Sequence, residues 1–230
     1  MERERVRAEV DARLVADRIS TLQHHLAALA PENSVGIVAV TKGFGVDAPR
    51  AALAAGLTMV GENYAQELIA KHEELTPEER EQIQWHFLGR LQRNKVRSLA
   101  PIVSVWQSVD RVELIEEIAR RSAGASVMIQ LNISGEPQKG GAALGDCGSL
   151  VRSAQGSGLV VVGLMGVGAA EDESTSRDGF RHLVELAEDL GLPERSIGMS
   201  DDLDLAVAEG STMVRIGTAL FGPRGPRTPA

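Results

Sequence analysis

The sequence predicts a single-domain (β/α)8 barrel, a TIM-type α/β fold in which eight parallel strands are surrounded by helices, with one extra helix in front. Three observations support it: eight short apolar runs alternate with helical patterns, one helical pattern precedes them, and little of the 230-residue chain remains outside these segments. Such alternation predicts a parallel sheet, either open and doubly wound or closed. Eight units of ~25 residues favour the closed barrel.

The leading helix is predicted from apolar residues that recur at steps of three and four. These residues are Val6, Val10, Leu14, Val15, Ile19, Leu22 and Leu26. Pro31 interrupts the pattern, so we expect residues 1–30 to form an amphipathic helix packed on a barrel of residues 31–222. The remaining residues, 223–230, are rich in proline and arginine, and we expect a flexible tail.

The eight apolar runs are predicted to be strands buried on both faces, because they are β-branched and apolar at successive positions instead of alternating. They span residues 35–40, 57–61, 83–89, 102–106, 126–133, 159–167, 195–199 and 211–217. Helical patterns lie between them, the clearest at 48–56, 63–75, 110–121 and 176–191.

Composition and charge exclude several classes of function. A net charge of −8 and 3% aromatic residues argue against nucleic-acid binding, which needs a basic face and stacking platforms. No apolar run approaches the ~20 residues needed to cross a bilayer, and the charged N-terminal segment resembles no secretory signal, so a cytoplasmic location is expected. Cys147 is the sole cysteine, and without CxxC spacing no metal site is predicted.

Functional residues of such barrels lie where strands end and the following loops begin. The first run leads directly into Thr41, Lys42 and Gly43. A lysine half-buried at the mouth of an apolar barrel loses hydration, which favours its neutral, nucleophilic amine and allows a Schiff base with a carbonyl group. A solvated loop lysine is the alternative interpretation of Lys42.

The ends of the last two runs are candidates for a phosphate site. Ser200 offers a hydroxyl, Arg215 a positive charge, and Gly217 and Thr218 offer backbone amides. Ser200 is also explained as the N-cap of a following helix, and Gly217 as a simple turn residue. The two aspartates after Ser200 would repel a phosphate unless they face away from it.

Four other segments carry polar residues near strand ends. Asn63 either binds a ligand oxygen or caps the next helix, and the cap is preferred from the residues alone. His86 is interpreted as a core histidine with a satisfied hydrogen bond. Residues 89–97 hold several cations that form either an anion-binding rim or a solvated helix face. Lys139, on a glycine-flanked loop, either reaches the site or is a mobile, solvent-exposed lysine, and the second interpretation is preferred.

Seven segments together resemble one known family. They are AVTKGFG, GENYAQE, WHFLGRLQRNK, SVDR, NISGEPQKGG, GLMGVG and GMSDDLDLAVAEGSTMVRIGTALFG. In this order, from about residue 35 to 222, they closely resemble the pyridoxal phosphate homeostasis proteins, single-domain alanine-racemase-like barrels that bind pyridoxal 5′-phosphate (PLP).

The resemblance implies roles for residues already singled out. Lys42 is expected to form the internal aldimine with PLP, Asn63 to lie near the ring oxygen, and Arg215 beside the pyridine ring and near the phosphate. Ser200, Gly217 and Thr218 are expected to form the phosphate site, and Lys139 resembles a loop lysine linked to cofactor handling. No catalytic residue and no metal ligand is implied.

The function implied by the resemblance is intracellular PLP homeostasis, by reversible carriage or buffering of the cofactor without catalytic turnover. PLP-dependent apoenzymes are the expected recipients, and the protein is expected to be a monomer. One alternative is a PLP-dependent, racemase-like enzyme, although alanine racemases use a second domain and an opposing tyrosine, and Tyr64 is the only tyrosine here. A third interpretation is a phosphosugar enzyme whose substrate forms a Schiff base with Lys42.

Overall fold

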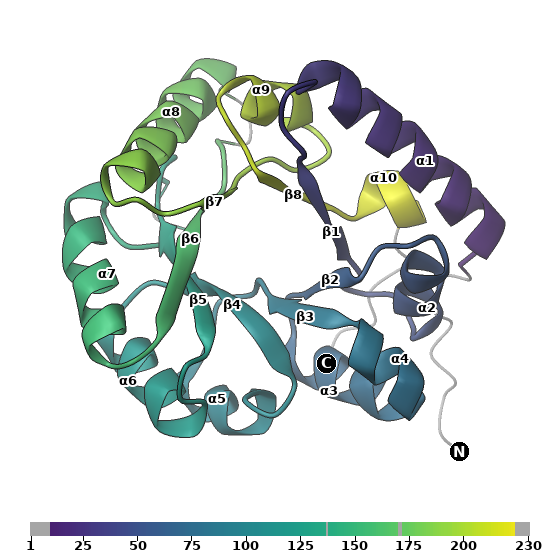
Figure 1. The fold of residues 1–230 in the computed structure, drawn as a ribbon, viewed down its shortest axis with the longest axis horizontal. Helices are drawn as coiled ribbons and strands as arrows, with labels where there is room; N and C mark the ends of the chain where they lie inside the picture. The colour runs from purple at the N-terminus through teal and green to yellow at the C-terminus, as the bar shows by residue number, and fades with distance from the viewer. Residues whose placement is uncertain (1–9, 137, 170–171, 224–230) are drawn as a thin grey trace.

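The structure is a closed barrel of eight parallel strands with helices packed around its outside (Figure 1). It is a computed structural model that describes residues 10–136, 138–169 and 172–223. The strands neighbour one another in chain order, and the last pairs with the first through Gly36 and Met213. The predicted (β/α)8 fold and its extra N-terminal helix are therefore confirmed.

The strands lie within or close to the predicted apolar runs. They are β1 (Gly36–Val40), β2 (Met59–Glu62), β3 (Gln84–Phe87), β4 (Val103–Val109), β5 (Ser126–Leu131), β6 (Val160–Gly166), β7 (Glu194–Ser196) and β8 (Met213–Ile216). The register pairs Val40 with Gly61 and Ala39 with Ile216, which aligns the carboxyl ends of β8, β1 and β2 at one mouth.

The helices follow the strands as the alternating pattern predicts. They are α1 (Ala12–Leu29), α2 (Asp47–Ala54), α3 (Ala65–Glu74), α4 (Pro77–Gln82), α5 (Arg93–Leu99), α6 (Val112–Arg121), α7 (Cys147–Gly156), α8 (Glu173–Asp189), α9 (Leu203–Ala208) and α10 (Thr218–Phe221), with a 3-10 turn (Leu144–Asp146) before α7. Sequence analysis missed α4, which begins after Thr76 with a reciprocal capping box to Glu79. Within the described ranges, no helix is long and apolar enough to cross a membrane.

Helix α1 packs on the outside of the barrel, beside α2, α9 and α10 (Figure 1). It begins after Asp11, whose side chain accepts hydrogen bonds from the amides of Arg13 and Leu14. It buries Val15, Ile19 and Leu26. The division at residues 30 and 222 stays a prediction, because residues 1–9 and the proposed tail at 224–230 lie outside the described residues.

Alternate residues of each strand face the helices or the barrel interior. In β1, Ile37 and Ala39 pack in an apolar cluster with residues of α1 and α2, whereas Val38 and Val40 belong to a separate cluster. The other buried members of that interior cluster are Leu88, Met128, Met165 and Met213. The barrel is thus filled with side chains, as is usual for this fold.

A chain of polar side chains also crosses the barrel interior. Arg215 Nη1 donates to Ser196 Oγ at 2.9 Å, and Ser196 Oγ donates to Gln107 Oε1 at 2.8 Å. Gln107 Nε2 lies 2.7 Å from His86 Nδ1, so it donates to a neutral imidazole whose proton is on Nε2. His86 Nε2 is buried and has no partner among the described residues, so the expected satisfied histidine is only half satisfied.

We predict that His86 makes the fold sensitive to mild acid. Burial lowers the pKa of His86 from 6.5 to about 4. Between those values the unfolded chain binds a proton that the folded barrel does not, so stability falls as pH drops through this window. His86→Gln should remove up to about 3 kcal/mol of the loss between pH 7 and pH 4.

Urea unfolding at both pH values measures this difference. His24→Gln, at an exposed position on α1, is the matched control and should keep the wild-type loss. An equal loss in wild type and His86→Gln would show that another group carries the acid sensitivity.

Candidate functional site

Three of the predicted site positions follow adjacent strands at the same mouth of the barrel. Lys42 comes two residues after β1, Asn63 directly after β2, and Gly217 directly after β8. Because Val40 pairs with Gly61, continuing the register brings Lys42 level with Asn63. A Cβ on Gly217 would lie 3.1 Å from the carbonyl oxygen of Val40, so β8 passes β1 closely here.

Lys42 is half-buried and occupies the second position of a tight turn. The amide of Phe44 donates to the carbonyl oxygen of Thr41 at 3.1 Å, which closes the turn. Gly43 has φ of 82°, the positive value that the third position of a type II turn requires. This local geometry explains why glycine follows the lysine, and it fixes where the Lys42 side chain leaves the backbone.

A buried ion pair lies beneath this turn. Lys71, from α3, forms a very short contact with Glu62 at the end of β2, and both side chains are almost fully enclosed. Lys71 Nζ also donates to the carbonyl oxygen of Thr41 at 2.7 Å, and Thr41 Oγ1 donates to Glu62 Oε1 at 2.7 Å. Burial raises the pKa of Glu62, while the charge and hydrogen bond of Lys71 oppose that rise.

Asn63 does not cap a helix, contrary to the preferred sequence interpretation. The N-cap of α3 is Tyr64, and no side chain makes a capping hydrogen bond there. The side-chain oxygen of Asn63 is instead buried and has no hydrogen-bond partner in the described residues. A Cβ on Gly89 would lie 1.9 Å from the Asn63 carbonyl oxygen, so only glycine allows this close approach. Asn63 is thereby held at the mouth with an unsatisfied polar group.

Arg215 is a buried cation inside the barrel. Its Nη1 donates to the carbonyl oxygen of Ser196 at 2.5 Å, and its Nη2 donates to that of Gly166 at 2.7 Å. Burial lowers the pKa of Arg215 to about 10, partly opposed by the negative charge of Asp202. The guanidinium therefore stays charged at neutral pH, without a carboxylate in direct contact among the described residues.

Ser200 is exposed on the loop between β7 and α9. Its alternative role as an N-cap is wrong, because the cap of α9 is Asp202 and makes no side-chain capping bond. Asp202 Oδ1 accepts a hydrogen bond from the Met199 amide at 2.6 Å, so this carboxylate binds its own loop. Ser200 lines a cavity of about 1120 Å³, which the other five predicted cofactor-binding residues do not line.

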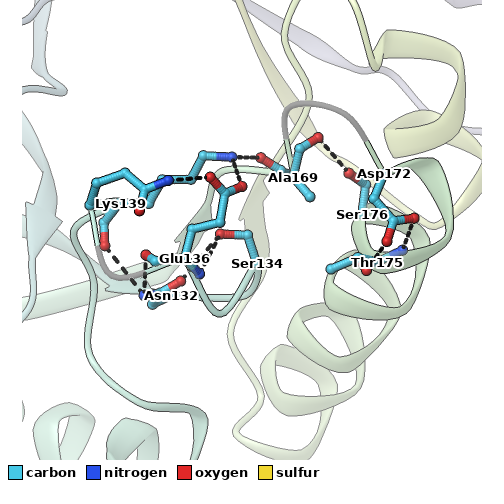
Figure 2. Close-up of polar contacts among 10 residues, drawn as sticks. Asn132, Ser134, Glu136, Lys139, Ala169, Asp172, Thr175 and Ser176 are labelled. Atoms are coloured by element: carbon cyan, nitrogen blue, oxygen red, sulfur yellow. Dashed lines mark hydrogen bonds and ion pairs between the residues drawn. The ribbon is translucent and has the colours of Figure 1, made fainter.

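Lys139 lines the same cavity and is held in place, contrary to the expected solvent-exposed lysine (Figure 2). Its Nζ donates to Glu136 Oε1 at 2.6 Å and to the carbonyl oxygen of Gly168 at 2.5 Å. Asn132 Nδ2 supports the loop by donating to the carbonyl oxygens of Glu136 and Lys139. Lys139 thus links the loop after β5 to the loop after β6.

In the cationic segment 89–97, residues 93–97 lie on α5, whereas Arg90 precedes the helix and is exposed. Arg93 Nε, in α5, lies 3.6 Å from Glu117 Oε2 of α6, and Arg97 is exposed. This arrangement favours the solvated helix face over an anion-binding rim. Among the described residues, no group of three or more His, Cys, Asp or Glu side chains is arranged to hold a metal ion.

The contribution of α3 to the Lys42 turn was not predicted from the sequence. Glu67 and Lys71 lie one turn apart in the predicted helix 63–75, and Glu67 Oε2 accepts a hydrogen bond from the Gly43 amide at 2.7 Å. Their spacing is the only signal in the sequence, and it is shared with ordinary solvent-exposed ion pairs. The mouth thus carries the Lys42 amine, the buried Arg215 guanidinium and the unpartnered Asn63 oxygen, while the Ser200 hydroxyl lines a cavity that these three residues do not line.

Comparisons with known proteins agree with this chemistry. The family described as alanine racemase, N-terminal domain, matches residues 10–225. A pyridoxal phosphate homeostasis protein of Pseudomonas aeruginosa is 42% identical over 86% of this chain and 88% of its own. Another, of Aquifex aeolicus, is 39% identical over 74% and 78% of the two chains.

A solved structure gives the same answer for the fold. PipY of Synechococcus elongatus, with PLP bound, superimposes with a TM-score of 0.78 at 32% identity, covering 90% of this chain and all of that one. The predicted family is confirmed by these matches. The chain belongs to the pyridoxal phosphate homeostasis proteins, within the alanine racemase N-terminal domain family.

Proposed function

We propose that this protein binds PLP reversibly and acts in PLP homeostasis, with the cofactor attached through a Schiff base to Lys42. The observation that carries the proposal is the half-buried Lys42 in its fixed turn, level with the unpartnered Asn63 oxygen. The names of the relatives and the PLP bound to PipY support it. The cofactor would supply an aldehyde that condenses reversibly with a primary amine.

The residues at the mouth fit the parts of PLP. Asn63 would bind the ring oxygen, which would satisfy a side chain that otherwise lacks a partner. Ser200 and the amides of Gly217 and Thr218 would bind the phosphate, and the first amides of α10 have no acceptor within that helix. Arg215 would lie beside the ring and contribute a fixed positive charge.

The same charge argues against strong catalysis. A guanidinium beside the pyridine ring disfavours protonation of the ring nitrogen, which weakens the ring as an electron sink. A racemase also needs an acid–base group on the opposite face of the substrate, and Tyr64, the only tyrosine, is 39% exposed. We therefore propose a carrier or buffer instead of a racemase-like enzyme.

The wider setting belongs to the same proposal. We infer that the protein acts as a monomer in the cytoplasm and that PLP-dependent apoenzymes receive the cofactor. Lys139 takes part in cofactor handling through its position on the cavity wall shared with Ser200. Its present bonds to Glu136 and Gly168 hold two loops of the mouth together.

The first prediction from the proposed function concerns the residue to which PLP is attached. Lys42→Ala should remove the absorbance at ~420 nm that a PLP Schiff base gives, because no other lysine occupies the turn after β1. The far-ultraviolet circular dichroism should stay unchanged. Lys95→Ala, on α5, is the control and should retain the band. A borohydride-reduced cofactor found on Lys139 or Lys95 would refute the assignment.

A second prediction concerns the phosphate. Ser200→Ala should weaken PLP binding by roughly 1 to 2 kcal/mol, because one charge-assisted hydrogen bond is lost while the amides of Gly217 and Thr218 remain. Arg215→Ala should weaken binding further. Ser157→Ala, at an exposed position after α7, is the control. Equal affinity of the wild-type protein for pyridoxal and PLP in a titration would show that no phosphate site exists.

The third prediction concerns turnover. The PLP-loaded protein should show at most trace α-deuterium incorporation with L-alanine, L-serine or L-glutamate in deuterated water. Each general acid–base role contributes about 10² to 10⁴ in rate, and we propose that no side chain of this protein acts as the opposing base. Nuclear magnetic resonance and chiral chromatography follow exchange and inversion. Turnover of about 1 s⁻¹ or faster would favour the racemase-like alternative.

A further inference from the structure

Both peptide groups that flank Lys42 are held by side chains of one helix, α3. Lys71 Nζ binds the carbonyl oxygen of Thr41, and Glu67 Oε2 binds the amide of Gly43. We propose that Glu67 and Lys71 are positioning residues that fix the Lys42 turn for covalent attachment of an aldehyde ligand. The inference rests on the proposed function and adds two residues that the proposed PLP site does not include.

Lys71 holds the peptide before Lys42 through buried contacts. Its ammonium is enclosed, with 2% of the side chain exposed, and it pairs with the fully enclosed Glu62. Thr41 Oγ1 donates to the same Glu62 oxygen, so the residue before Lys42 is bound through both its backbone and its side chain. Rotation of the peptide between Thr41 and Lys42 would break a bond to a buried charge, which is costly.

The hydrogen bond between Glu67 and the Gly43 amide is not needed to satisfy a buried donor. Its side chain is 33% exposed and lies 3.8 Å from Lys71, one helical turn away. The Gly43 amide that it binds lies at an exposed residue, where water is an adequate acceptor. Satisfying a buried donor therefore does not explain this contact. Holding the peptide after Lys42 in one orientation does explain it.

The two contacts together fix the direction in which Lys42 leaves the backbone. Lys42 lies between the two held peptide groups, so neither of its backbone dihedral angles can change without breaking a contact with α3. Covalent attachment requires the amine to approach the aldehyde carbon along a narrow path, and small misplacements slow such reactions strongly. Binding of the phosphate and ring does not need this alignment.

That difference gives a test with two ligands. PLP carries the aldehyde, whereas pyridoxine 5′-phosphate has the same ring and phosphate with an alcohol in its place. Glu67→Ala should weaken PLP binding about fivefold or more and slow attachment similarly, because one charge-assisted bond is lost. Binding of pyridoxine 5′-phosphate should change less than twofold. The induced circular dichroism of bound PLP, per mole bound, should also change.

Two further variants of α3 serve as controls. Glu73→Ala makes the same change at an exposed position of the helix and should leave both ligands unaffected. Glu67→Gln keeps an oxygen that can accept the hydrogen bond from the Gly43 amide. It should therefore retain most of the PLP binding that Glu67→Ala loses. Recovery by Gln and not by Ala would identify the hydrogen bond as the relevant feature.

The Lys71 side needs a paired substitution. Lys71→Met alone leaves Glu62 buried without a partner and is expected to destabilise the fold. The double variant Glu62→Gln, Lys71→Met removes both charges, and far-ultraviolet circular dichroism checks that it folds. It should show the same selective loss of PLP over pyridoxine 5′-phosphate.

Two results would overturn the inference. One is an equal loss of both ligands in Glu67→Ala, which would mean that α3 supports the whole site. The other is unchanged PLP binding and attachment in Glu67→Ala. Failure of the proposed function has a different signature: the wild-type protein itself would then bind PLP no more tightly than pyridoxine 5′-phosphate, with no Schiff-base band.

Discussion

The buried pair of Glu62 and Lys71 joins the end of β2 to α3 and, through Thr41, to the end of β1. The attraction between two buried charges offsets the free-energy cost of their desolvation only when further hydrogen bonds surround them. Thr41 provides these bonds, so the strand ends and the helix keep one relative position. The Lys42 turn follows β1 directly, so its geometry depends on the fixed position of the strand ends relative to α3.

Arg215, from β8 beside β1, sets the electrostatic character of the neighbouring part of the barrel interior. It is held by the carbonyl oxygens of Ser196 and Gly166, and it stays charged although burial lowers its pKa to about 10. Asp202, whose negative charge partly opposes this lowering, binds the Met199 amide. The barrel interior therefore holds a positive charge next to β1. This local positive charge contrasts with the net charge of −8 of the whole chain.

The fold was predictable because continuous apolar runs alternating with helical patterns leave few topologies open. The placement of Lys42 and Asn63 at the mouth followed from the same strand boundaries. The roles of Glu67 and Lys71 were not predictable, because an i,i+4 pair looks alike on an exposed face and over a strand end. Asn63 was misjudged for a similar reason: cap preference is local, whereas its burial depends on the close approach of Gly89.

The most direct test of the account is a crystal structure of the wild-type protein loaded with PLP. The account predicts continuous density from Lys42 Nζ to the cofactor and the phosphate near Ser200 and Gly217. It also predicts that Glu67 and Lys71 still bind the peptides that flank Lys42. Density joined to another lysine, or a turn that has left α3 on loading, would contradict it.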